Sequence, residues 1–265
     1  MIKSEIKQLF RSKWIYMLLC IFIVLFVSIL MLQQLNVDAG GFDRFQASIL
    51  NLLLFLFPLF ILTIGAMSIA ADIESGWYQL IRSYPVNIIH YLTAKYVALV
   101  TIFLFALFTT EAVILLMGAF FGGVHIDRYF LILTIVIIAV FSAMSVMIGA
   151  ISIHRLQALG FSLGVWALFT LLSNYIVMAV GTIIPKQMYE NVIYAHVHLN
   201  IIEWLRYIYL IQIEQTGILG KSFYYLTQFY ETKIGFFLMI GITALWWFMP
   251  LCLAYFKLKR KENSK

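Results

Sequence analysis

DIESGWYQLIRSYPVNIIHYLTAK, residues 72–95, is a polar segment between two apolar runs that are each long enough to cross a bilayer. Residues recur in it at helical spacing on two opposite faces. The predicted apolar face comprises Ile73, Trp77, Leu80 and Ile81, and the predicted opposite face comprises Glu74, Tyr78 and Arg82. Pro85 ends the pattern, because proline lacks the N–H of a helix interior. We predict an amphipathic helix over residues 72–84, which either rests on lipid headgroups or is held by a cytosolic partner.

The composition is that of a membrane protein. Of the 265 residues, 63% are hydrophobic and 11% are charged, whereas soluble domains are about 45–50% apolar and about 25% charged. The formal net charge of +6 comes from basic residues at the ends of apolar runs, which is typical of topology signals and not of a nucleic-acid surface. We therefore predict an all-α integral membrane protein with a single transmembrane domain over residues 1–265 and no nucleic-acid partner.

Six apolar runs have about the length that a membrane-spanning helix needs. They cover residues 14–32, 45–71, 96–121, 129–153, 156–184 and 234–256. Residues 1–13 predict a short basic amphipathic helix on the membrane surface. His154 and Arg155 alone join the fourth and fifth runs, which predicts an antiparallel hairpin. Residues 185–233 form the one long outer segment, where we expect short extracellular helices.

Lysine and arginine fix the orientation. With both termini inside, the inner segments hold twelve of these residues and the outer segments hold six. Because positive residues are retained on the cytosolic side, this imbalance predicts that both termini and residues 72–95 are cytosolic.

Five further residues are candidates for function. Glu111 is the one acidic residue in the middle of a spanning run, and it either lines a translocation pathway or is a neutral packing residue. His196 and His198 form an HxH pair that either binds a metal or is ordinary surface. Gly160 and Gly164 form a GxxxG step, which serves either packing within the chain or dimerisation.

Motifs for catalysis are missing from the sequence. The tripeptide at residues 220–222 is Gly-Lys-Ser, but position 215 is Gln where a phosphate-binding loop needs its first glycine. No HExxH pattern occurs, and the one GxSxG match, Gly160-Phe-Ser-Leu-Gly164, lies inside a predicted spanning run and not at a strand-to-helix turn. The chain is therefore predicted not to be an enzyme and to bind no cofactor of its own. Powered transport would need a separate ATPase subunit.

Residues 72–95 resemble a pattern of the ABC-2 type transporter permeases. The matching elements are Asp72-Ile-Glu74-Ser-Gly76, then Arg82-Ser-Tyr84-Pro85, then Lys95. Six spans, an N-terminal interfacial helix and a larger outer segment between spans five and six are similar to that family as well. Further stretches resemble the permease that accompanies nitrous-oxide reductase maturation, a copper-linked system. They are residues 40–42, 47–52, 155–160, Trp166, and 199–200 leading to Arg206.

The resemblance implies the membrane subunit of an ABC transporter in a bacterial cytoplasmic membrane. ATP and Mg²⁺ would bind to the cytosolic ATPase partner, and a second permease copy and membrane lipids would be the other partners. Residues that would couple the permease to the ATPase are Asp72, Glu74, Gly76, Tyr84 and Pro85. Export is the expected direction, with copper-enzyme maturation as one role. Export of a lipid or peptide antibiotic and gradient-driven secondary transport are the alternatives.

Overall fold

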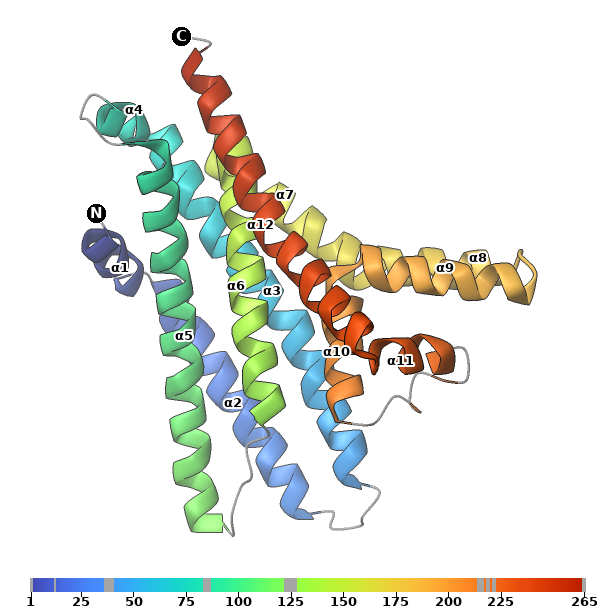
Figure 1. The fold of residues 1–265 in the computed structure, drawn as a ribbon. Coiled ribbons are helices and arrows are strands. Elements are labelled where there is room, and N and C mark those ends of the chain that lie inside the picture. The colour runs from blue at the N-terminus through green and yellow to red at the C-terminus, as the bar shows by residue number, and fades with distance from the viewer. Residues whose placement is uncertain are drawn as a thin grey trace.

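The computed structural model describes residues 2–11, 13–35, 41–82, 87–121, 128–213, 217, 220 and 223–263. Every regular element within these residues is helical, which confirms the predicted all-α class (Figure 1). The first half of the chain forms α1 (Ile2–Phe10), α2 (Lys13–Leu35), α3 (Gly41–Glu74), α4 (Trp77–Arg82), α5 (Ile88–Phe121) and α6 (Arg128–Ile151). The second half forms α7 (Arg155–Ala167), the π-helical turn η1 (Leu168–Leu172), α8 (Ser173–Gly181), α9 (Lys186–Leu199), α10 (Ile201–Gln212), α11 (Tyr224–Tyr230) and α12 (Lys233–Asn263).

Five helical stretches among the described residues are long and apolar enough to cross a membrane. They are Leu50–Glu74, Ile88–Val113, Arg128–Ile151, Arg155–Gly181 and Lys233–Lys261. In α2 the apolar stretch found among the described residues, Ile15–Val24, is shorter than a span. The crossing predicted for residues 14–32 therefore stays a prediction. The helix α5 begins at Ile88, ahead of the predicted start of its span at residue 96.

The centre of the bundle is the close approach of α3 and α6. A Cβ atom added to Gly65 would lie 2.2 Å from the Ser145 Oγ, and one added to Gly149 would lie 2.7 Å from the Ile69 Cβ. Only glycine fits at such distances, because real Cβ contacts are not shorter than about 3.0 Å. These two glycines therefore bring the α3 and α6 backbones together, as small residues do where helices pack in lipid.

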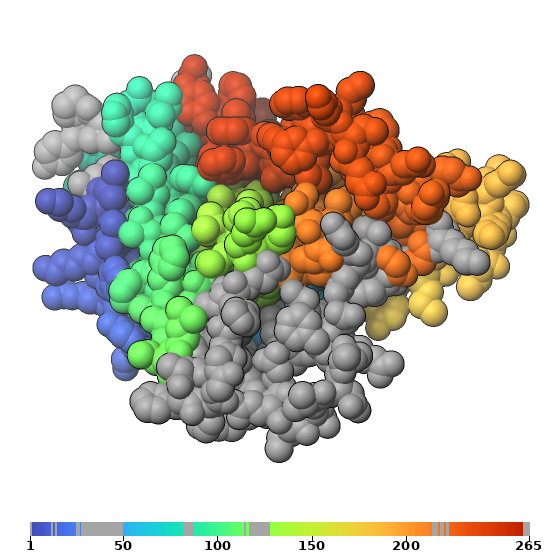
Figure 2. All heavy atoms as spheres, turned by 60° about the horizontal axis from the view of Figure 1, so that its bottom comes forward, coloured from blue at the N-terminus to red at the C-terminus, as the bar shows by residue number. Residues whose placement is uncertain are grey.

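The segment α7–η1–α8 packs along α3 and then leaves the bundle. The Ser162 Oγ donates to the Leu62 carbonyl at 3.0 Å, and the Trp166 Nε1 donates to the Phe55 carbonyl at 2.9 Å. From residue 163 to residue 181 no side chain is fully buried, and α8 and α9 project sideways together in two views (Figures 1 and 2). Helix α7 packs mainly along α3 and to a lesser extent along α6, the partner that the predicted hairpin gave it.

Helix α10 lies in the core between the bundle and the projecting arm. Its residues Trp204, Leu205 and Tyr207 are buried. Aromatic rings of α10 and α11 pack on one another, with the Trp204 and Tyr230 ring centroids 5.5 Å apart. These contacts anchor α11 and the start of α12 to the bundle.

Candidate functional site

A buried ion cluster joins three helices at the end of the molecule that also holds α4 and the C-terminus. The Lys95 Nζ of α5 lies 2.5 Å from a Glu5 carboxylate oxygen of α1 and 2.8 Å from an Asp72 carboxylate oxygen of α3. Lys95 is 1% exposed, and each of the two acids is 5% exposed. Because charges so removed from water are stable only when paired, the cluster holds the amphipathic α1 against α3 and α5.

Two further groups form hydrogen bonds with the charged groups of the cluster. The Tyr91 hydroxyl donates to the Asp72 carboxylate at 2.9 Å, and the Ser68 Oγ lies 3.4 Å from the Lys95 Nζ. One ammonium faces two carboxylates, so the phenol donor supplies the hydrogen bond that a second cation would otherwise provide. The sequence pattern placed Asp72 on a surface for an ATPase, whereas the structure places it inside the permease.

Gly76 ends α3 and sets the direction of α4. Its φ is +74°, a left-handed backbone conformation that glycine adopts without steric cost. The Ser75 N–H donates to the Ala71 carbonyl and the Gly76 N–H to the Ile73 carbonyl, which closes the last turn of α3. The Leu80 N–H then donates back to the Gly76 carbonyl, so a new helix starts after the break. The predicted single helix over 72–84 is therefore two helices, and Tyr84 and Pro85 lie outside the described residues.

This break changes the predicted faces of α4. Tyr78, predicted on the face opposite the apolar one, is buried, with its ring centroid 5.1 Å from that of Tyr91. Trp77 and Leu80, predicted on the apolar face, are 49% and 50% exposed, while Ile81 of the same face packs against the core. Helix α4 thus presents two large apolar side chains outward and is fixed through Tyr78 to the ring that contacts Asp72. Figure 1 shows α4 at the end of the bundle that also holds the C-terminus.

Glu74 links the end of α3 to the start of α7. One of its carboxylate oxygens accepts from the Arg155 backbone N–H at 2.9 Å and lies 3.7 Å from the Arg155 Nε. A carboxylate at a helix N-terminus is favoured by the free N–H groups and the helix dipole. Both side chains are exposed, so the ion pair itself contributes little. The contact nevertheless places the fifth span beside the base of α4.

A second polar cluster lies where α8, α9 and α10 meet. Asn200 caps α10 by accepting from the Ile202 N–H at 3.0 Å, and its Nδ2 donates to the Phe169 carbonyl and to the Ser173 Oγ, both at 2.7 Å. Phe169 belongs to η1, where the π-helical turn alters the regular pairing of carbonyl groups. The cluster therefore ties the projecting arm to the core.

Ionisable groups complete this cluster. The Arg206 Nη1 lies 2.7 Å and 2.8 Å from the two Glu203 carboxylate oxygens, and the Asn174 Nδ2 donates to Glu203 at 3.1 Å. The His196 Nε2 lies 3.4 Å from the Asn200 Nδ2. His198 contacts different groups, namely the Tyr194 carbonyl and the Tyr230 hydroxyl.

The histidine pair is not arranged as a chelating site. Residues two apart on a helix point in different directions, and the two imidazoles have separate partners. Within the described part of the chain, no group of three or more His, Cys, Asp or Glu residues lies close enough to hold a metal ion.

Acid is expected to weaken the junction of α9 and α10. Burial lowers the pKa of His196, the Glu203 charge opposes this shift, and the Arg206 charge adds to it. The unfolded chain therefore binds the proton first, and stability should fall slightly as pH drops below about 6.5, the ordinary histidine pKa. Thermal unfolding in detergent at pH 7.5 and 5.5 measures this. His196→Gln should reduce the pH dependence, while the exposed His90→Gln should leave it unchanged; equal pH dependence in all three proteins would contradict the assignment.

The other predicted residues lie apart from these clusters. Glu111 is buried in α5, and its Oε1 has no hydrogen-bond partner among the described residues. Gly160 and Gly164 are exposed on α7, and a Cβ added to either would meet nothing within 4 Å. Packing within the described chain therefore does not use them, and the residues that α7 turns toward α3 are Ala158 and Ser162.

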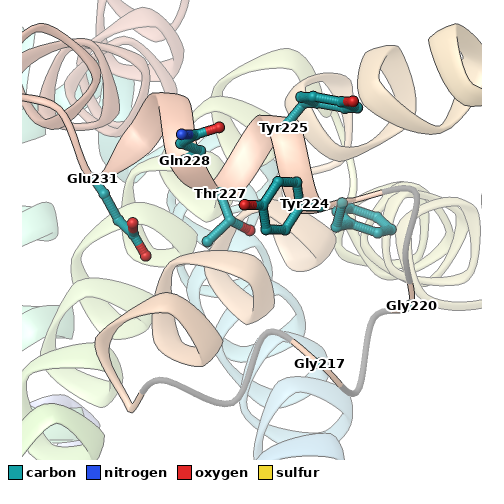
Figure 3. A pocket seen from close by; sticks show the side chains of 8 residues that line it. Gly217, Gly220, Tyr224, Tyr225, Thr227, Gln228 and Glu231 are labelled. Atoms are coloured by element: carbon teal, nitrogen blue, oxygen red, sulfur yellow. The ribbon is translucent and has the colours of Figure 1, made fainter.

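A pocket of about 690 Å³ lies beside α11 (Figure 3). Its described lining is Gly217, Gly220, Phe223, Tyr224, Tyr225, Thr227, Gln228 and Glu231. Figure 3 shows Gly217 and Gly220 beside the labelled side chains of α11.

These features define a multi-pass helical membrane protein with a surface helix fixed to a buried ion cluster. The family model described as "ABC-2 family transporter protein" matches residues 1–263. The chain therefore belongs to the ABC-2 transporter family, as residues 72–95 predicted, and is a membrane transport component. The match is to the family as a whole and does not single out the copper-linked permease. No curated protein matches the chain significantly.

Proposed function

We propose that this chain is the membrane subunit of an ABC transporter and that a separate cytosolic ATPase binds to α4. The observation that carries the proposal is the exposure of Trp77 and Leu80 on α4. The buried Tyr78 fixes this helix to the rest of the protein. Large apolar side chains at the tip of a surface helix suit insertion into a groove of a partner protein. ATP and Mg²⁺ would be bound by that partner.

The contacts around α4 connect it to the spanning helices, so that a displacement of α4 would be transmitted to them. Tyr78 packs on Tyr91, Tyr91 donates to Asp72, and Asp72 pairs with Lys95 and thereby with Glu5. The Glu74 contact with Arg155 adds the start of the fifth span. A displacement of α4 by the ATPase would thus move α1, α3, α5 and α7 together, and the conformational change would follow hydrolysis in the partner.

A second copy of the chain completes the proposed transporter. The arm of α7, η1 and α8 buries little of its apolar surface within the chain, and Gly160 and Gly164 offer a place where another helix could approach closely. The excess of lysine and arginine supports cytosolic placement of α4 and of both termini in the cytoplasmic membrane. Outward transport is the proposed direction.

Removing the two exposed apolar side chains of α4 should release the ATPase. Each such contact is worth about 1–2 kcal/mol at an interface, so Trp77→Ala with Leu80→Ala should weaken binding about 10- to 1,000-fold. The experiment purifies the tagged chain from its native membranes. It measures ATP hydrolysis per permease and identifies the hydrolase by mass spectrometry from its phosphate-loop peptide.

A matched control removes two exposed aromatic side chains of α11, which lies away from α4 (Figure 1). Tyr224→Ala with Tyr225→Ala deletes similar area from α11 and should leave the ATPase bound. Unchanged hydrolysis in the α4 variant, with the permease correctly inserted, would refute docking on α4. Transport that needs no ATPase and is lost in Glu111→Gln would instead establish a gradient-driven secondary transporter.

A further inference from the structure

An apolar groove runs along the outer surface of the bundle between the start of α5 and the second half of α12. Its volume is about 260 Å³. The lining residues share helical spacing on the two helices: Ile89, Leu92, Thr93 and Tyr96 from α5, and Phe248, Leu251, Cys252, Tyr255 and Phe256 from α12. The groove therefore lies at the α4 end of two spanning helices, parallel to the chains of surrounding lipids.

The groove wall leaves little for a polar ligand to bind. The Thr93 Oγ1 already donates to the Ile89 carbonyl at 2.8 Å. The Tyr96 hydroxyl already accepts from the Trp247 Nε1 at 2.7 Å. The remaining lining is hydrocarbon, aromatic ring and one thiol. A polar ligand would lose hydrogen bonds to water on entry, whereas a hydrocarbon chain has none to lose.

Basic residues follow directly where the groove ends on α12. Lys257, Lys259 and Arg260 are exposed, and Lys259 lies one helical turn beyond Tyr255, with its Nζ 5.7 Å from the centre of that ring. Lys261 points inward and donates to the carbonyls of Ala150 and Ser152, so it serves the end of α6. Lys259 is thus the cation placed above the groove.

We propose that this groove binds one anionic glycerophospholipid, with an acyl chain between α5 and α12 and its phosphate at Lys259. The apolar lining selects the chain, and the cations beyond it select the negative headgroup. Basic pockets between spanning helices near the membrane surface bind anionic lipids in this way. The bound lipid would bridge α5 to α12 and stabilise their contact. This site does not depend on the ATPase.

The test compares phosphatidylglycerol with phosphatidylcholine on the purified full chain in detergent. Native mass spectrometry counts the retained lipids, and thermal unfolding measures their effect. Phosphatidylglycerol should bind about tenfold more tightly, because Lys259 attracts the anionic headgroup and the neighbouring cations add to this attraction. Lys259→Gln should reduce this preference, while both lipids still bind. Lys233→Gln, at the other end of α12, should retain the preference.

Filling the groove provides the second variant. Cys252→Trp should abolish retention of the lipid, whereas Cys20→Trp, at the other exposed cysteine, should not. Lys259 is exposed, so Lys259→Gln keeps the proposal testable even if the tryptophan variant fails to fold. An unchanged lipid preference in Lys259→Gln would overturn the headgroup site. Equal retention in the Cys252→Trp and Cys20→Trp proteins would overturn the groove.

Discussion

Replacing Lys95 with methionine is expected to destabilise the protein by about 3–5 kcal/mol, the cost of removing one partner from a buried ion pair. Glu5 and Asp72 would remain within the protein without their cation, and the Tyr91 hydroxyl can donate to only one of them. The measurement is the unfolding midpoint in detergent, together with protease cleavage near the N-terminus. Cleavage should accelerate because α1 loses its attachment.

Two controls separate charge from side-chain shape. Lys7→Met removes an exposed lysine from α1 and should change stability by less than about 0.5 kcal/mol. The triple variant Glu5→Gln, Asp72→Asn, Lys95→Met removes all three charges and should recover much of the loss. If the triple variant is as unstable as Lys95→Met alone, unpaired charge is not the cause.

Gly149→Leu is expected to separate α3 from α6 and to cost at least about 1–3 kcal/mol, the usual cost of overpacking. Even the first carbon would lie 2.9 Å from the Ala66 backbone carbonyl oxygen, an atom that cannot rotate away. Measured unfolding of the monomer in detergent should therefore show a lower midpoint than the natural chain.

Gly164→Leu is the matched control, because it makes the same change at a helical position with open space around it. Both substitutions replace glycine in a helix by a better helix former, so their difference isolates packing. The monomer should tolerate Gly164→Leu, while association of two copies should weaken if the proposed pairing uses this face. Equal destabilisation by the two substitutions would contradict the packing assigned to Gly149.

Local patterns predicted helices well and contacts poorly. Apolar runs of sufficient length predicted an all-helical membrane protein, because in lipid the backbone must satisfy its own hydrogen bonds. The GxxxG pattern singled out Gly160 and Gly164, but the glycines at the contact between α3 and α6 are Gly65 and Gly149. These two lie on different helices, so no spacing within one run identifies them.

In the candidate site, too, the sequence predicted the helices better than their contacts. The motif at residues 72–95 correctly identified the family and a surface helix, yet helical periodicity assigned Tyr78 to the wrong face. A single left-handed residue, Gly76, shifts the phase of everything after it. Glu5 was missed as a buried residue, because its environment depends on Lys95, and no pattern in residues 1–13 reports a partner so distant.

The pairing of Glu5 with Lys95 also has a consequence for biogenesis. The two residues are 90 positions apart, and chains are synthesised at about 5–20 residues per second. For roughly 5–20 seconds after α1 leaves the ribosome, its acid therefore has no permanent partner. The N-terminal helix must wait at the membrane surface until the third predicted crossing arrives. Final attachment of α1 is thus one of the later steps in assembly of this half of the bundle.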